Sequence, residues 1–381
     1  MDIQVASGDT LSAAAGQLSG GPFHFATVHS NCTAVLSDAG PAKLPSSLHG
    51  ATSCLGAMTH KGKTGGVAIF CISDPDGAYG TGMARFCGDP RNAAAEATNK
   101  ALLDADRIGE QPELVWVSAT PGSEEDIVEG IQDIIGAEIP IIGGSAADNS
   151  VSGDWLVFDG TSTESEGVIV SVLFPSRPIS FAYQNGYSPT EKQGRVTKAK
   201  GRTVEEIDGK PAMDVYAEWT GGAVPTVPAG QGSDAILGAS TLWPLGREIN
   251  QVGQVPFYLL AHPATAHESG AMDLFATVEE GEELTLMNGT KQSLVERAGR
   301  VAALARETGR MSDAPISGAL MIYCGGCMLS VQDEIPEVVS GVNDALGGAP
   351  FLGAFTFGEQ GALLNAGNRH GNLMISCIVF G

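Results

Sequence analysis

The second half of the chain repeats the element order of the first half, at an offset of about 205 to 210 residues. The apolar stretch 114–119 corresponds to 319–324, and the stretch 168–174 corresponds to 374–380. In both copies a helix with an acidic start follows the first strand, and a glycine-containing strand follows that helix. Unrelated α/β chains share single patterns of this kind by chance, but a near-constant offset over about a hundred residues favours internal duplication.

The alternation of strands and helices predicts an α/β fold with two pseudo-equivalent halves. Connections that contain a helix join parallel strands, whereas hairpins join antiparallel strands, so we expect mixed sheets. One hairpin is predicted across the turn sequence Asp74-Pro-Asp-Gly77. A glycine- and proline-rich stretch marks a boundary near residue 220, between domains 1–220 and 221–381. A ligand cleft is expected where the strand ends of the two halves meet.

The charge balance excludes several classes of partner. The chain has 44 acidic and 21 basic residues, a formal net charge of −23. Nucleic acids and anionic membrane surfaces are bound through Lys and Arg, so neither is expected as a partner. The N-terminus lacks the pattern of a signal peptide, and no apolar run approaches the length of a membrane span. We therefore expect an acidic cytoplasmic protein, in which the seven cysteines are reduced thiols.

Cys324 and Cys327 follow a predicted buried strand and are separated by two glycines. A helix is predicted to begin only near Asp333, too far away to lower the pKa of Cys327, which disfavours a redox pair. Structural zinc is disfavoured because the chain has no second CxxC, and no metal ligands are predicted. As a nucleophile or thiol acid/base, Cys324 would need a base such as His29 or His370. A functional and a purely structural Cys324 both remain open.

Other polar residues also lie at predicted strand ends. Glu359 follows an apolar strand and Gly358, where a carboxylate beside an aromatic wall suits an amine or general acid/base chemistry. The predicted Gly143-Gly144-Ser145 turn would hold a carboxylate or oxyanion through its backbone N–H groups, or would simply be a tight turn. The predicted ligand-binding residues are Gly143, Gly144, Ser145, Asp148, Asn31, Cys32, Gly358, Glu359 and His370. Cys324 and Glu359 are the predicted catalytic residues if the protein is an enzyme.

Three segments carry a family resemblance. They are Pro140-Ile-Ile-Gly-Gly-Ser-Ala-Ala-Asp148, Asp208-Gly-Lys-Pro-Ala-Met-Asp-Val-Tyr216 and Phe351-Leu-Gly-Ala-Phe-Thr-Phe-Gly358-Glu359. With these segments the chain resembles the FIST proteins, whose N- and C-terminal FIST domains would correspond to 1–220 and 221–381. The resemblance implies a ligand-binding sensory module of bacterial signal transduction, with small molecules such as amino acids as ligands. Some members resemble haem-carrying nitric-oxide sensors.

The chain departs from the family pattern in two respects. We expect no attached kinase, cyclase or chemoreceptor domain, because the 381 residues leave no room for one. Gly325-Gly326-Cys327 also stands where family members tend to carry an Arg shortly after the cysteine. The first hypothesis is a stand-alone sensory protein that binds a small, amino-acid-like ligand and acts through a signalling partner or a second copy of itself. The alternatives are an enzyme that uses Cys324 with Glu359, and a gas sensor with non-covalent haem; otherwise no cofactor is expected.

Overall fold

The computed structural model describes residues 1–31, 44–252, 255–308, 315–363 and 366–381. Three six-stranded sheets form its core, and each contains the same four-stranded unit. Numbered along the chain, the strands of each unit lie side by side in the order first, fourth, second, third. The fourth strand runs antiparallel to the second, and the second strand runs parallel to the third. These mixed sheets with covering helices confirm the predicted α/β class. We call this assembly the three-unit core.

The strands of the three units follow one another along the chain. Unit 1 consists of β1 (Asp2–Gly8), β6 (Val67–Ser73), β2 (Phe25–Ser30) and β3 (Leu48–Thr52). Unit 2 consists of β7 (Ala78–Arg85), β12 (Gly167–Phe174), β8 (Leu114–Ala119) and β9 (Ile141–Ser145). Unit 3 consists of β13 (Ile179–Asn185), β27 (Met374–Phe380), β23 (Gly318–Cys324) and β24 (Phe351–Thr356). Units 2 and 3 are the two copies seen in the sequence, and unit 1 is a third occurrence of the same strand order.

A hairpin that follows each parallel partner strand crosses to another unit. The crossing hairpins are β4 (Ala57–Thr59) with β5 (Gly62–Thr64), β10 (Val157–Phe158) with β11 (Thr163–Glu164), and β25 (Glu359–Leu363) with β26 (Gly367–Gly371). In that order, the hairpins pair antiparallel with β24, β3 and β9, so that each unit donates a hairpin to one neighbour and receives one from the other.

The hairpin predicted across Asp74–Gly77 is wrong. The turn forms, but its flanking strands do not pair with each other: β6 pairs with β1 and β2, while β7 pairs with β12.

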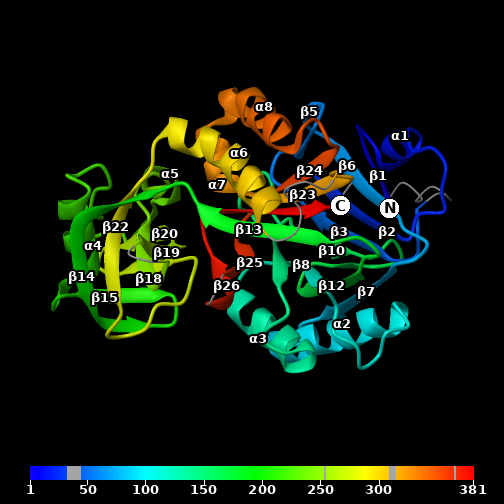
Figure 1. The fold of residues 1–381 in the computed structure, drawn as a ribbon. Helices are drawn as coiled ribbons and strands as arrows, with labels where there is room; N and C mark the ends of the chain where they lie inside the picture. The colour runs from blue at the N-terminus through cyan, green and yellow to red at the C-terminus, as the bar shows by residue number, and fades with distance from the viewer. Residues whose placement is uncertain (32–43, 253–254, 309–314, 364–365) are drawn as a thin grey trace.

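One apolar core fills the space between the three sheets. It contains fully buried side chains from every unit, among them Phe70, Trp116 and Phe380. Helices cover the outer faces: α1 (Leu11–Ala15) on unit 1, α2 (Pro90–Asp104) and α3 (Glu124–Ile135) on unit 2, and α6 (Lys291–Glu307) and α8 (Ile335–Leu346) on unit 3 (Figure 1). Apolar area removed from water stabilises a fold by about 25 cal/mol per Å², so this shared core holds the three units together.

A nine-stranded sheet is inserted into unit 3, between β13 and α6 (Figure 1). Its strands are β14 (Ser188–Lys200), β15 (Thr203–Ile207), β16 (Lys210–Pro211), β17 (Ser233–Ala235), β18 (Leu245–Val252), β19 (Val255–Ala261), β20 (Pro263–His267), β21 (Met272–Leu274) and β22 (Glu283–Asn288). It carries α4 (Ala212–Trp219) and α5 (Leu237–Ser240), and it has an apolar core of its own. We call residues 188–288 the inserted sheet. The candidate site lies where it meets the three-unit core.

Candidate functional site

Cys324 and Glu359 lie together inside the protein, at the ends of neighbouring elements. Cys324 ends β23, and Glu359 begins β25. The Glu359 carboxyl is completely buried; it accepts hydrogen bonds from Thr356 Oγ1 and from the Met374 backbone N–H, both at 3.0 Å. The Tyr183 hydroxyl donates to the carbonyl oxygen of the same Glu359 at 2.9 Å. The structure therefore brings together the two residues that the sequence analysis singled out for catalysis.

Burial decides the protonation of this pair. Burial raises the pKa of Glu359 well above its ordinary value, the Cys324 thiol beside it raises the pKa further, and hydrogen bonds from Met374 and Thr356 oppose the shift. Burial also raises the pKa of Cys324 well above that of an ordinary thiol. Among the described residues, no cation forms an ion pair with Glu359. The site therefore favours an uncharged carboxyl and an uncharged thiol.

A helix begins directly after Cys324, contrary to the sequence expectation. Cys324 is the N-cap of α7 (Gly325–Ser330), whereas the prediction placed the first helical turn near Asp333. A 3₁₀ turn (Gln332–Glu334) and α8 follow. Cys327 lies in the first turn of α7 with no exposed surface. The argument from helix placement against a Cys324–Cys327 pair is therefore wrong.

Gly143, Gly144 and Ser145 form part of strand β9 rather than a turn. The strand lies between β8 and β25, and the Ser145 N–H donates to the Gly358 carbonyl at 2.7 Å, so this donor is not free for an anion. Glycine is required by packing, because a Cβ on Gly143 would lie 1.8 Å from the Val117 carbonyl oxygen. A ligand contact in this segment would have to use the Ser145 hydroxyl.

Asp148 organises the loop that follows β9. Its carboxylate oxygens accept the backbone N–H groups of Ser150, Val151, Ser152, Gly153 and Asp154. Burial raises the pKa of Asp148, but these hydrogen bonds outweigh burial and lower it below the ordinary value. The carboxylate is ionised and already satisfied by its own loop.

The remaining predicted residues lie in different surroundings. Asn31 follows β2 and donates its backbone N–H to the Gly66 carbonyl at 3.2 Å. Cys32 lies outside the described residues. A Cβ on Gly358 would approach His370 Cε1 to 2.8 Å, so glycine permits the close contact between β25 and β26. No hydrogen bond among the described residues joins His29 or His370 to Cys324, so neither candidate base reaches this thiol.

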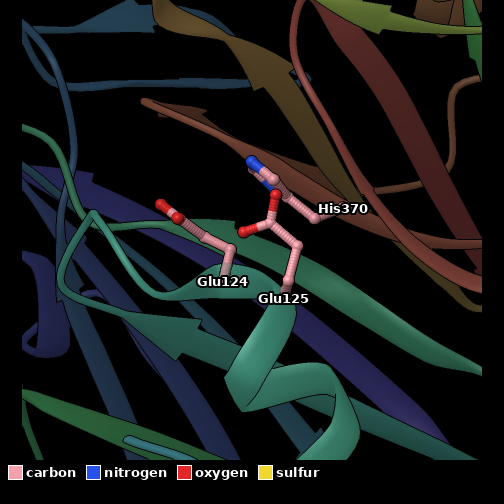
Figure 2. A group of neighbouring side chains, drawn as sticks. All are labelled: Glu124, Glu125 and His370. Atoms are coloured by element: carbon pink, nitrogen blue, oxygen red, sulfur yellow. The ribbon is translucent and has the colours of Figure 1, made fainter. Parts of the chain in front are cut away.

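A second carboxylate cluster, missed in the sequence, lies beside His370. Glu124 and Glu125 open α3, and their side chains lie beside His370 (Figure 2). Each glutamate also places a carboxylate oxygen 2.6 Å from one guanidinium nitrogen of Arg202, which lies in the inserted sheet. Glu124 Oε1 also accepts the Ser145 hydroxyl at 2.8 Å, and Glu125 Oε1 accepts the Thr277 N–H at 2.9 Å. We call Glu124, Glu125, Arg202 and His370 the ionic cluster.

The ionic cluster has the residue types of a metal site but not its free ligand atoms. One atom each from Glu124, Glu125 and His370 lies within 4.8 Å of the others. However, Arg202 bonds to both carboxylates, and all four carboxylate oxygens accept protein donors. The His370 ring nitrogens face Gln360 Nε2 at 3.3 Å and the Phe275 carbonyl at 3.2 Å. A cation would have to displace Arg202, so these residues do not fit a bound metal.

Haem does not fit this region either, because an axial ligand needs a free ring nitrogen and both ring nitrogens of His370 already face protein groups.

Two cavities lie elsewhere on the surface. One, of about 660 Å³, lies on the inserted sheet beside His267 and Asp273, and the other, of about 410 Å³, lies beside His24 and Tyr79. Neither is lined by Cys324 or Glu359. The predicted cleft between strand ends is therefore not shown by the structure.

Comparison with known families covers most of the chain. Residues 23–210 match the FIST N domain, and residues 212–362 match the FIST C domain. The chain belongs to the FIST family. FIST domains are associated with sensory and signal-transduction roles.

Individual relatives add little to the family assignment. An uncharacterised protein of Methanocaldococcus jannaschii is 37% identical over 95 residues, which are 24% of this chain and 19% of the relative. The matched segment thus spans about a fifth of that relative's length. The cyanuric acid hydrolase of A. caulinodans aligns over 99% of this chain and 97% of its own at 10% identity and a TM-score of 0.34. T. maritima PurL complexed with AMPPCP aligns over 61% of this chain and 38% of its own at 16% identity and a TM-score of 0.19.

These structural likenesses are too distant to support any functional argument. In the part of the chain that the structure describes, no helix is long and apolar enough to cross a membrane.

Proposed function

We propose that this FIST protein is a cytoplasmic sensor that binds a small, amino-acid-like ligand beside Glu359. The observation that carries the proposal is the completely buried Glu359 carboxyl, which has no cationic partner among the described residues. Burying a carboxyl without a counter-charge costs free energy, and the pKa of Glu359 is raised as a result. The ammonium group of a ligand would supply the missing charge.

The surroundings of Glu359 support a polar ligand. The Thr356 hydroxyl donates to the Glu359 carboxyl, and the Tyr183 hydroxyl donates to the Glu359 carbonyl oxygen. Since Glu359 has no exposed surface, a ligand can enter only if neighbouring elements move, and we propose a movement of the inserted sheet relative to the three-unit core. The ionic cluster bridges that boundary, so ligand entry would disturb it. Such a movement is a signal that a partner protein or a second copy of the chain would read.

Catalysis by Cys324 receives less support. Burial raises the pKa of the Cys324 thiol, which disfavours the thiolate that a nucleophile needs. Neither His29 nor His370 forms a hydrogen bond to it in the described structure. We therefore favour binding over catalysis.

A thermal-shift screen of the standard amino acids and simple amines tests the proposal. A ligand at a hundredfold excess over its Kd should stabilise the protein by about 2.7 kcal/mol. Glu359→Gln should abolish the shift, because a glutamine cannot become a counter-charge. Glu205→Gln, in the cavity of the inserted sheet, is the matched control and should keep it. No shift with any compound, or a shift that survives Glu359→Gln, would overturn the proposal.

A further inference from the structure

The start of α7 brings two thiols together. Cys324 and Cys327 are three residues apart across the first turn of the helix, a spacing that places side chains on the same face. Besides burial, the Cys327 thiol lies near enough to Cys324 to raise the pKa of the Cys324 thiol, and the Cys324 side chain forms no capping hydrogen bond to the helix. A Cβ on Gly326 would lie 3.7 Å from Cys324 Sγ, an ordinary van der Waals distance, whereas one on Gly325 would come to a tight 3.1 Å from the Thr356 carbonyl oxygen.

We propose that Cys324 and Cys327 form a redox-active dithiol that a small peroxide converts into an intramolecular disulfide. The proposal goes beyond ligand binding and does not depend on it. It would make the buried site at the strand ends responsive to oxidants as well as to a ligand.

The orientation of the Cys327 thiol supports this role. The Tyr187 hydroxyl donates to the Thr241 carbonyl at 2.8 Å, so its proton is already used. The Cys327 sulfur lies 3.5 Å from the same hydroxyl oxygen, and its S–H is therefore the donor in that contact. Tyr187 thus holds Cys327 in place beside Cys324, within the same buried pocket of side chains.

The reaction balances with one peroxide for each disulfide. The Cys324 thiol first loses its proton, a step that its raised pKa makes slow. The sulfur then attacks one oxygen of hydrogen peroxide; an S–O bond forms, the O–O bond breaks, and the leaving hydroxide takes up that proton and departs as water. The Cys327 sulfur then attacks the Cys324 sulfur; an S–S bond forms, the S–O bond breaks, and a second water leaves with the Cys327 proton. Two sulfur atoms lose two electrons in total, and the peroxide gains them. Glu359, which lies against the Cys324 thiol, is placed to relay the first proton.

Accessibility assigns the order of the two thiols. Cys324 is 6% exposed and Cys327 is fully buried, so a small neutral peroxide meets Cys324 first. Cys71 and Cys377 lie in the interiors of β6 and β27 and have no exposed surface. Cys87 is exposed, so its oxidation is the competing reaction that the test has to exclude. The Cys324–Cys327 pair is therefore the preferred site of disulfide formation.

The test is peroxide treatment of the full-length protein, followed by denaturation, alkylation and peptide mass mapping. Two of the seven thiols should lose reactivity, and the peptide that contains both Cys324 and Cys327 should be lighter by two hydrogen atoms, reversibly with a dithiol reductant. Cys327→Ser should stop the reaction at a Cys324 sulfenic acid, which a dimedone adduct reports. Cys324→Ser should give neither product at position 327.

Cys87→Ser is the control and should form the disulfide at the wild-type rate. Oxidation confined to Cys87, or a disulfide between Cys54 and Cys324, would overturn the proposal. The mapping of the wild-type protein decides the question even if a cysteine variant fails to fold. Because none of these measurements uses a ligand, failure of the ligand screen leaves them unaffected.

Discussion

Two buried carboxylate sites lie on either side of one strand and have opposite electrostatics. The Ser145 hydroxyl of β9 donates to Glu124, while Gly144, the preceding residue, is paired with Glu359 of β25. Both carboxyls are nearly or completely buried, and burial raises the pKa of each. The net pKa is nevertheless lowered at Glu124 and raised well above the ordinary value at Glu359.

The difference comes from the neighbouring charges. At Glu124, His370, Arg202 and the Ser145 hydroxyl together outweigh burial. At Glu359 the neighbours are a thiol, a hydroxyl and one backbone N–H, and the thiol raises the pKa further. Burial alone therefore does not determine whether a carboxyl is ionised; at Glu124 the neighbouring cation helps to keep the buried carboxyl charged. The ionic cluster is complete within the protein, whereas the site at Glu359 lacks a charge that a ligand would bring.

Removal of Arg202 should have the largest effect. Arg202→Met keeps the apolar stem but leaves the Glu124 side chain, only 2% exposed, without its cation. Loss of one partner of a buried ion pair costs about 3–5 kcal/mol, to be measured by urea denaturation. Arg85→Met is the control, since Arg85 is 63% exposed and 3.8 Å from Glu164, and should cost at most about 1 kcal/mol. Adding Glu124→Gln to Arg202→Met should restore part of the loss. Equal costs for the two arginines would contradict this account of the cluster.

The same substitution at the two carboxyls should have unequal effects. Glu124→Gln removes charge-assisted hydrogen bonds and should cost about 2 kcal/mol. Glu359→Gln replaces an uncharged carboxyl with an uncharged amide of the same shape, whose oxygen still accepts the Met374 N–H and whose NH₂ faces Thr356 Oγ1. It should change the free energy of unfolding by less than about 1 kcal/mol. A cost at Glu359 as large as that at Glu124 would show that Glu359 is ionised.

Part of this fold is readable from the sequence because apolar strands and helix starts leave local patterns. The copies that contain 114–119 and 319–324 were recognisable for that reason. Unit 1 was not, since the helix between its first two strands, α1, has only five residues and gives a weak signal. The turn at Asp74–Gly77 was also predicted correctly, as the Gly77 N–H donates to the Asp74 carbonyl at 3.1 Å. A turn does not reveal which strands pair, however, and here its flanking strands enter different sheets.

The candidate site shows the same limit. Strand ends can be located in the sequence, so Cys324 and Glu359 could be placed near each other. Arg202 could not be linked to Glu124 and Glu125, because 77 or 78 residues separate them and the contact depends on how the inserted sheet packs on α3. The paired glutamates were interpreted only as a helix start. Long-range ion pairs of this kind have no local signature, which is why the charge difference between the two sites emerged only from the structure.

The smallest expected effect is a pH dependence of opposite sign at the two sites. In the ionic cluster, burial is outweighed by His370 and Arg202, and the pKa of Glu125 falls to about 2. A carboxyl with a lowered folded pKa stabilises the protein above its ordinary pKa, about 4.5, and this contribution disappears as pH falls toward about 2. Since the Glu125 side chain is 36% exposed, solvent screening limits the contribution to about 1 kcal/mol. Glu359 behaves oppositely. Its raised pKa gives a contribution to stability that is complete below about pH 4.5 and is lost as the pH rises through the pKa of the folded state.

Urea denaturation of the wild type, Glu125→Gln and Glu359→Gln between about pH 3 and pH 8 measures both effects. The free energy of unfolding of the wild type, compared with that of Glu125→Gln, should fall toward acid pH. Compared with that of Glu359→Gln, it should fall toward neutral and alkaline pH. If the two differences followed pH in the same direction, the two carboxyls could not differ in charge as the structure indicates.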